Sequence, residues 1–198
     1  GGVVVVQGTG GTGTGTSETN IGVRVRSAAL ITSAGGSVTV TGQGGASPGE
    51  KNSGVIVEAG GTIRAGSGGA VSVTGTGDTS AGLATKADNV GVLVRGGTIE
   101  AENAALTVTG TGGQGDGGGN SGVVLAAVSN LSRIRGIGTA TVTVQGFGGT
   151  GQGAAAVGNV GVEVASFNNF TTFEGGIQSE GGAIVIEGTG GIDTGATK

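Results

Sequence analysis

The sequence predicts an all-β fold: a parallel β-helix, or β-solenoid, with three short strands in each coil and 31 to 40 residues per coil. Three observations predict this fold. One phrase recurs five times, two further β-patterned segments follow each recurrence in the same order, and 51 of the 198 residues are glycine. Repeats with a period of roughly 20 to 50 residues are typical of such architectures. Because parallel crossovers are right-handed in the great majority of cases, we expect a right-handed coil.

The recurring phrase is Asn-x-Gly-Val-x-Val, and it predicts the first strand of each coil. Its intervals are 32, 37, 31 and 39 residues, and Leu125 replaces the last valine of the fourth copy. The phrase opens at Asn20, Asn52, Asn89, Asn120 and Asn159. We interpret the chain as a single solenoid segment over residues 1–198, in which a partial coil (1–19) precedes five coils that open at 20, 52, 89, 120 and 159.

Two further segments in each repeat predict the second and third strands. The second segments read LITSAGG, TIRAGSGG, TIEAENA, SRIRGIG and GGIQSEGG, and the third read SVTVTG, AVSVTG, ALTVTG, TVTVQG and AIVIEG. Val38 and Val40 alternate with Thr39 and Thr41, which is the period-two pattern of a strand in β-branched residues. A glycine costs a helix about 1 kcal/mol at each site, so we expect no helix.

Alternate side chains of each strand should point into the coil and stack on their equivalents one coil away, about 4.8 Å apart. Small β-branched side chains suit such a narrow lumen, in agreement with the absence of Trp and Tyr. The first strand predicts the columns Val23, Val55, Val92, Val123, Val162 and Val25, Val57, Val94, Leu125, Val164. The third strand predicts the column Val40, Val73, Val108, Val144, Ile186.

The repeated asparagine is expected at a corner just before the first strand. Asparagine tolerates the left-handed region of backbone conformation, and its amide both donates and accepts hydrogen bonds. We expect a hydrogen-bonded ladder along the solenoid axis, formed by Asn20, Asn52, Asn89, Asn120 and Asn159. The alternatives are five independent turn residues and a metal- or ligand-binding role.

Gly-rich segments of varying length follow the third strands: GQGGASPGEK, GTGDTSAGLATKAD, GTGGQGDGGG and GFGGTGQGAAAVG. We expect them to project from one corner as loops that serve as structural spacers. Longer inserts, 126–136 and 165–176, separate the first and second strands of the last two coils. Three phenylalanines in the second insert are expected to cap a wider part of the lumen or to form an apolar contact patch: Phe167, Phe170 and Phe173.

The two ends of the chain resemble each other. Residues 1–18 match residues 181–198 at nine of eighteen positions without gaps, and each is a third strand with its loop. Neither has the polar character of a terminal repeat that caps a solenoid. We therefore expect a segment of a longer solenoid, or a unit that stacks end to end on copies of itself.

The residue types exclude several kinds of chemical site. Without Cys or His, the sequence offers no disulfide, no zinc or iron–sulfur site and no Ser-His-Asp triad. GASPGEKNS (45–53) and GIDTGATK (191–198) lack the spacing of a P-loop. The only cofactor that the sequence suggests is calcium, at GGQGDGGGN. Calcium is not favoured, because this stretch has a single Asp where calcium ligation needs several oxygens. We expect no catalytic, cofactor-binding or metal-binding residues and no enzyme activity.

A carbohydrate-binding or carbohydrate-cleaving β-helix is the main alternative. Glu100 and Glu102 lie on a predicted second strand, with Arg64 and Arg133 or Arg135 near the equivalent positions of neighbouring coils. General acid–base cleavage needs two carboxyls roughly 5 to 9 Å apart across a cleft. A flat, repeating face offers no evident cleft, so solvated charge is the favoured interpretation.

Ice binding is a more remote alternative, because third strands place a Thr-x-Thr pattern outward in several coils. The outer coils interrupt that pattern with Val5 and Gln7 and with Val185 and Glu187. The charge balance argues against nucleic acid as a partner, since nine basic residues face thirteen acidic ones. No apolar run approaches the roughly 18 residues of a spanning helix, so we expect no membrane span.

The repeat phrases also resemble those of a known family. NSGVIV, TIRAGSGG and AVSVTGTG are similar to the β-strand repeats of very large bacterial secreted proteins related to filamentous haemagglutinins, over all 198 residues. The resemblance implies a right-handed β-helix displayed outside the cell as a stalk, adhesin or filament, and it transfers no catalytic residues. We therefore expect a structural or adhesive protein of the cell surface whose partners are itself, through end-to-end stacking or a longer chain, and glycans or a cell surface.

Overall fold

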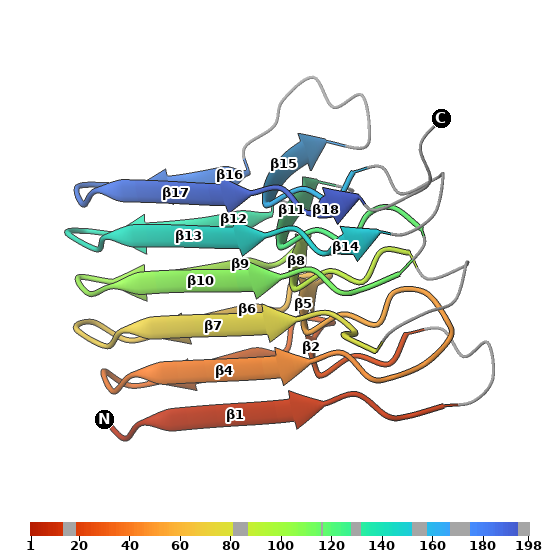
Figure 1. Cartoon of the computed structure of the whole chain (residues 1–198). Coiled ribbons are helices and arrows are strands. Elements are labelled where there is room, and N and C mark those ends of the chain that lie inside the picture. Colours follow the sequence, from red (N-terminus) through yellow and green to blue (C-terminus); the bar gives the residue numbers. More distant parts are fainter. Residues whose placement is uncertain are drawn as a thin grey trace.

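The computed structural model confirms a β-solenoid built from parallel sheets (Figure 1). It describes residues 1–13, 19–80, 87–115, 117–127, 132–151, 158–166 and 175–193, apart from the side chains of Ser166 and Asp193. Within these ranges every regular element is a strand, and no helix occurs. Each repeat contributes one strand to each of three sheets, as the three β-patterned segments predict.

Sheet A has six strands, and each neighbouring pair in it is parallel. In stacking order they are β1 (Val4–Thr9), β4 (Val38–Gln43), β7 (Val71–Thr76), β10 (Leu106–Thr111), β13 (Val142–Phe147) and β17 (Ile184–Thr189). These are the third strands of the repeats. All six have the same length and the same register, so equivalent residues of successive coils form straight rows across the sheet.

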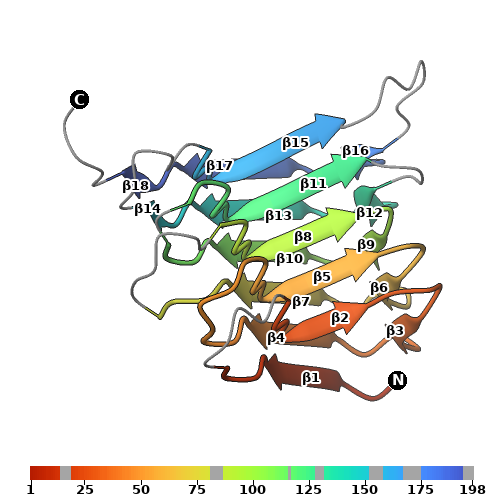
Figure 2. The same ribbon diagram turned by 90° about the vertical axis from the view of Figure 1, so that its right-hand side faces the viewer.

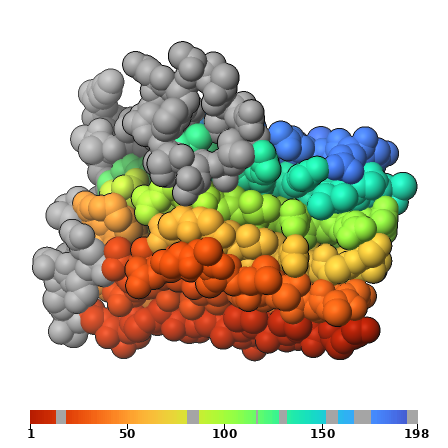
Figure 3. Space-filling model, turned by 180° about the vertical axis from the view of Figure 1, so that it is seen from behind, coloured from red at the N-terminus to blue at the C-terminus, as the bar shows by residue number. Residues whose placement is uncertain are grey.

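Sheets B and C have five strands each, formed by the first and second strands of the repeats. Sheet B, which faces the viewer in Figure 2, contains β2 (Val23–Val25), β5 (Val55–Glu58), β8 (Val92–Arg95), β11 (Val123–Ala127) and β15 (Val162–Ser166). Sheet C contains β3 (Leu30–Ser33), β6 (Thr62–Ala65), β9 (Thr98–Glu102), β12 (Arg133–Ile137) and β16 (Gly176–Ser179). Seen from behind, successive coils appear as stacked bands from red to blue (Figure 3).

The core is a column of aliphatic side chains enclosed by the three sheets. Neighbouring strands pair Val55 with Val92, Val57 with Val94 and Val73 with Val108, and the central members of these rows are fully buried. Sheet C adds a row that the sequence analysis did not specify: Ile31, Ile63, Ile99, Ile134 and Ile177. Thr-Ile-x-Ala at 62–65 and Thr-Ile-Glu-Ala at 98–101 are the signal that predicts this row.

The Gly-rich segments are partly incorporated into the β scaffold. A fourth sheet of two short parallel strands, β14 (Thr150–Gly151) and β18 (Ile192–Asp193), lies at the loop corner. A further parallel bridge joins Gln114 to Thr150. The expectation that these segments only project as spacers is therefore wrong for their first residues, because they continue the hydrogen bonding between coils before they diverge.

Two rows of glycine set the distance between sheets A and B. The fifth residue of each sheet A strand is glycine, and in the first five strands it lies against the glycine of the Asn-x-Gly-Val phrase in the next coil. A Cβ added to Gly110 would lie well inside van der Waals distance of the carbonyl oxygen of Gly122, and one added to Gly122 would meet the backbone nitrogen of Phe147. Both glycines are therefore required by space, which explains why they recur in every repeat.

The glycine contact gives a sharp prediction. Gly110→Ala forces backbone atoms apart in the middle of the stack, so the free energy of unfolding should fall by about 3 kcal/mol or more. Chemical denaturation followed by circular dichroism measures this loss. Gly2→Ala is the matched control, because an added Cβ there meets nothing within 4 Å. Similar stability of the two variants would contradict the close approach of the two rows.

Candidate functional site

The five repeated asparagines lie in one column at the corner that precedes sheet B. The backbone N–H of each of the first four asparagines donates to the side-chain Oδ1 of the asparagine one coil later. The four distances are 3.0 Å from Asn20 to Asn52, 2.9 Å from Asn52 to Asn89, 3.2 Å from Asn89 to Asn120 and 3.0 Å from Asn120 to Asn159. The expected ladder thus has a mixed character, since the donor is mainly the backbone and the acceptor is the amide oxygen. Only Asn20 also donates through its own Nδ2 to the next asparagine, at 3.2 Å, among the described residues.

Asn52 and Asn120 also hold the loop that precedes each of them, whereas the buried Nδ2 of Asn89 has no hydrogen-bond partner among the described residues. The Nδ2 of Asn52 donates to the Gly49 carbonyl at 2.8 Å, and that of Asn120 donates to the Gly117 carbonyl at 2.9 Å. The backbone carbonyl of Asn52 accepts from the N–H of Asp78 in the loop after the next sheet A strand, at 2.9 Å. Asn52, Asn89 and Asn120 are completely buried. Asn52 therefore joins three segments: its side chain holds the end of one loop and the backbone of Asn20 in the preceding coil, and its backbone carbonyl holds the start of the following loop.

The left-handed conformation lies one residue earlier than expected. The residue before each asparagine has a positive φ, with values of 69° at Thr19, 60° at Lys51, 55° at Asp88, 78° at Gly119 and 82° at Gly158. The asparagines themselves do not have a positive φ. The preceding residue makes the turn, so the asparagine is left to supply hydrogen bonds, which is why its side chain recurs while the residue before it varies.

The predicted valine columns end at the C-terminal side of the stack in exposed side chains. In the first-strand columns Val23, Val55, Val92 and Val123 are buried, Val162 is half-buried and Val164 is 50% exposed. In the third-strand column Val40, Val73, Val108 and Val144 are buried, whereas Ile186 is 51% exposed. Exposure is thus confined to the last coil, where no further coil covers the lumen in this structure.

A buried carboxylate on the outer face of sheet B holds two arginines from neighbouring coils. Glu58 on β5 accepts from Arg24 Nε on β2 at 2.7 Å and from Arg95 Nη2 on β8 at 2.6 Å. The Glu58 side chain is only 7% exposed, while both arginines are half-exposed. Burial alone would raise the pKa of Glu58, but the hydrogen bonds from Arg95 and Arg24 and their charges outweigh it and lower that pKa.

This triad was missed by the sequence analysis, although the sequence carries a signal for it. Glu58 and Arg95 occupy the same position of successive repeats, in NSGVIVE and NVGVLVR. In a parallel, in-register sheet the same position of successive repeats means direct neighbours. Opposite charges at that position therefore predict an ion pair between coils.

A shallow groove of about 420 Å³ runs beside the triad over sheet B. Its floor is apolar, because the outward residues Ile56 and Val124 are themselves buried. Asp88 lies at its edge, where burial raises the pKa of the carboxyl, Lys51 opposes that rise and Glu50 adds to it. The groove combines an apolar floor with charged sides, which allows binding of an amphiphilic ligand but does not by itself select one.

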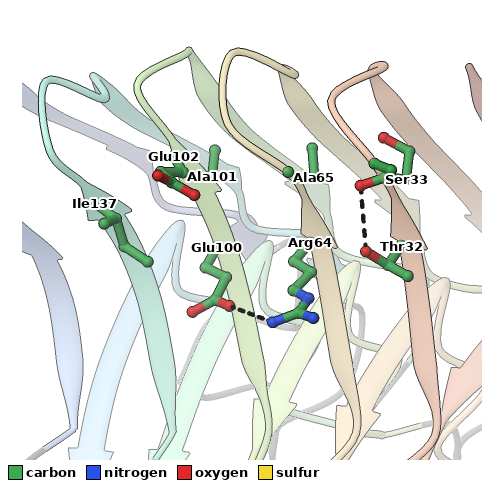
Figure 4. A pocket seen from close by; sticks show the side chains of 10 residues that line it. Thr32, Ser33, Arg64, Ala65, Glu100, Ala101, Glu102 and Ile137 are labelled. Carbon is green, nitrogen blue, oxygen red and sulfur yellow. Dashed lines mark hydrogen bonds and ion pairs between the residues drawn. The ribbon is translucent and has the colours of Figure 1, made fainter. Parts of the chain in front are cut away.

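A second hollow, of about 450 Å³, lies over the outer face of sheet C and contains the residues considered for carbohydrate chemistry. Figure 4 shows Arg64 on β6 and Glu100 on β9 pointing toward each other, with Arg64 Nη1 3.9 Å from Glu100 Oε1. Glu102 lines the same hollow. Register places Arg135 beside Glu100 on the next strand, but Arg135 forms its ion pair with Glu180.

Four charged residues on or beside sheet C thus form two ion pairs along the stack, Arg64 with Glu100 and Arg135 with Glu180. Glu180 is exposed, and its pKa is lowered by a hydrogen bond from the Gly138 N–H and by Arg135. Arg133 pairs in register with Thr98 rather than with either glutamate of β9. Among the described residues, no group of three or more Asp, Glu, His or Cys side chains is arranged to hold a metal ion.

Two features singled out in the sequence lie outside the described residues. They are the three phenylalanines of the second insert, Phe167, Phe170 and Phe173, and the single Asp of the GGQGDGGGN stretch, Asp116. The described part of the chain has no helix with the length and hydropathy needed to cross a bilayer.

Comparison of the chain with protein-family models, with curated proteins and with solved structures yields no match.

The asparagine column predicts a specific loss of stability. Asn89→Ala removes the oxygen that accepts from the buried Asn52 N–H, so the free energy of unfolding should fall by about 1 to 3 kcal/mol. Chemical denaturation measures the change. Gln178→Ala, at an exposed position of β16, serves as the control and should leave stability nearly unchanged. Equal losses in the two variants would contradict the role of the column.

The Glu58 triad predicts a dependence of stability on acid. Since the folded pKa lies below the ordinary value of 4.5, the unfolded state binds more protons as the pH falls. The contribution of Glu58 is therefore complete above about pH 4.5 and disappears as the pH drops through the folded pKa. Glu58→Gln should be less stable than the native chain at neutral pH, with a difference that shrinks on acidification.

Denaturation curves of the native chain and of Glu58→Gln between about pH 3 and pH 7 measure this difference in the free energy of unfolding. Asp88 contributes with the opposite sign, because its raised pKa makes it cost stability as the pH rises, but this contribution is common to both proteins. A stability difference between the native chain and Glu58→Gln that stays constant over the whole range would show that the triad contributes no pH dependence.

Proposed function

We propose that this chain is a segment of an extracellular structural or adhesive β-solenoid, acting as part of a stalk or filament of a bacterial surface protein. The observation that carries the proposal is the unbroken register of all three sheets, which repeats one coil on the next with no change of architecture. Each coil advances the solenoid by about 4.8 Å. Such a repeat serves reach and stiffness better than it serves a localised reaction.

The exposed apolar side chains on β15 and β17 support extension by further coils. Ile184 and Ile186 on β17 and Val164 on β15 belong to rows that are interior elsewhere, yet they are 43%, 51% and 50% exposed. One more coil would bury these side chains and would pair the open edges of the last strands. Burial of a single Ile or Val side chain contributes about 1.5 to 3 kcal/mol, so extension is favourable.

Head-to-tail stacking of identical copies would leave sheets B and C without a strand at the junction. Sheet A has six strands and sheets B and C have five each. If β1 of a second copy is placed on β17, the junction has a new strand in sheet A but none in sheets B and C. Additional coils of the same repeat fill all three sheets at once.

Display outside the cell is the part of the proposal that rests on the sequence. The repeat phrases resemble those of large secreted bacterial proteins, and a chain without cysteine needs no particular redox environment. The proposal assigns no catalytic step to this chain and no resident cofactor.

Immunogold electron microscopy of intact cells tests the proposal. Antibodies raised against the purified chain should label thin rods that extend from the cell surface, and diffraction from isolated rods should show a spacing of about 4.8 Å along the rod axis. Cells that lack the protein are the control. Label that appears only after permeabilisation, or on material without rods, would contradict the proposal.

Carbohydrate binding is the second candidate, and the hollow over sheet C is the observation that favours it. Arg64, Glu100 and Glu102 present charged groups around a concave surface of a size suited to a few sugar units. A glycan array probed with the chain and with Glu100→Gln distinguishes the two functions. Binding that the substitution abolishes supports the carbohydrate function, and sugar release would add a cleaving activity.

A further inference from the structure

The outer face of sheet A is almost free of charge. Its six strands place three residues each outward, at the second, fourth and sixth positions. Of these eighteen residues ten are threonine and one, Glu187, is charged. The rows are Val5, Thr39, Ser72, Thr107, Thr143, Val185; Gln7, Thr41, Thr74, Thr109, Gln145, Glu187; and Thr9, Gln43, Thr76, Thr111, Phe147, Thr189.

The other two faces carry the charges that sheet A lacks. Sheet B places Arg24, Glu58, Arg95 and Glu163 outward, and sheet C places Arg64, Glu100, Glu102, Arg133 and Arg135 outward. Solvent would accept charged residues equally well on all three sides of the coil. Their absence from one flat side matches the depletion of charge at the centre of protein interfaces.

We propose that the outer face of sheet A binds the same face of a second copy, so that two solenoids pair side by side. A face that contacts itself must be self-complementary, and threonine and glutamine meet this requirement because each of them both donates and accepts hydrogen bonds. The exposed apolar side chains on this face are Val5, Val185 and Phe147, at 60%, 44% and 44% exposure. Pairing removes them from water.

The single charge decides the relative direction of the two copies. Two copies that contact each other through the same face are related by a two-fold axis. If this axis runs along the stack, the two solenoids are parallel, and Glu187 of one copy lies opposite Glu187 of the other. If the two-fold axis runs along the strands, the solenoid axes are antiparallel and β17 lies over β1. Glu187 then faces Gln7, and Val185 faces Val5. Like charges in contact are unfavourable, so the antiparallel arrangement follows.

The contact area sets the strength of pairing. Six strands about 4.8 Å apart and about 20 Å long give a face of roughly 580 Å². A stable interface buries about 800 Å² per partner, which would need about eight strands. Two copies of this chain should therefore associate weakly, and solenoids with more coils should associate strongly because the area grows with each coil.

Sedimentation velocity over a range of concentrations tests the surface. The native chain should shift from monomer toward dimer as its concentration rises. Thr109→Glu places a charge at the centre of the face and should abolish the shift. Glu187 already occupies the same row, so the fold tolerates this residue there. Thr62→Glu, at an outward position of sheet C, is the matched control and should leave the dimer intact.

Disulfide trapping tests the direction and does not depend on a tight complex. The native chain has no cysteine. In the antiparallel pair Thr39 on β4 faces Thr143 on β13, so a mixture of Thr39→Cys and Thr143→Cys chains should cross-link on oxidation much faster than either variant alone. In each variant alone the two cysteines of a pair lie three strands apart, about 14 Å along the stack. End-on contact between copies brings neither residue to its partner.

The proposal is overturned if the native chain stays monomeric and the mixed cysteine variants do not cross-link. It is also overturned if Thr62→Glu weakens the dimer as much as Thr109→Glu does. A monomeric native chain that shows thermal hysteresis, lost in Thr109→Glu, would assign the face to ice binding instead. Glycan binding that is lost in the same variant would assign the face to carbohydrate. None of these outcomes bears on whether the chain is displayed at the cell surface, which the labelling experiment decides.

Discussion

In-register hydrogen bonding between successive coils is the constraint on which the rest of this structure depends. Each sheet A strand pairs with its neighbour over six residues, so a residue type that suits one coil must suit the space between the coils on either side. This explains why isoleucine stacks on isoleucine in sheet C and why glycine opposes glycine where sheets A and B approach. It also explains why Asn89 is both donor to Asn120 and acceptor from Asn52.

The same constraint determines where chemistry is possible. A side chain that points outward has its equivalents about 4.8 Å away in the coils on either side, so opposite charges meet in register, as Glu58 and Arg95 do on sheet B and Arg64 and Glu100 do on sheet C. The two charges of such a pair neutralise each other along the stack. The three faces differ mainly in how they use charge. Sheets B and C carry the ion pairs, whereas sheet A presents hydroxyl and methyl groups of threonine over a flat surface.

Repetition made the fold predictable from the sequence, because five copies of one phrase fix the strand order and the stacking partners at once. The backbone conformation at the corners and the contacts between side chains were harder to predict from the sequence. The left-handed residue is Thr19, Lys51, Asp88, Gly119 or Gly158, five positions with little in common, so composition pointed to the asparagine instead. The ion pair of Glu58 with Arg95 and the isoleucine row that contains Ile99 could have been predicted by aligning the other positions of successive repeats in the same way as the valines. The hollow over sheet C depends on the curvature of the outer surface, which periodicity does not encode.

Contacts between methyl groups in solution test the stacking most directly. With selectively labelled valine, nuclear Overhauser effects should connect Val55 with Val92 and Val92 with Val123, because each pair occupies adjacent strands in register. No such effect should connect Val55 with Val123, which lie two strands apart. Absence of the first contact, or contacts that require neighbouring strands to run in opposite directions, would contradict the solenoid and with it the function proposed for this chain.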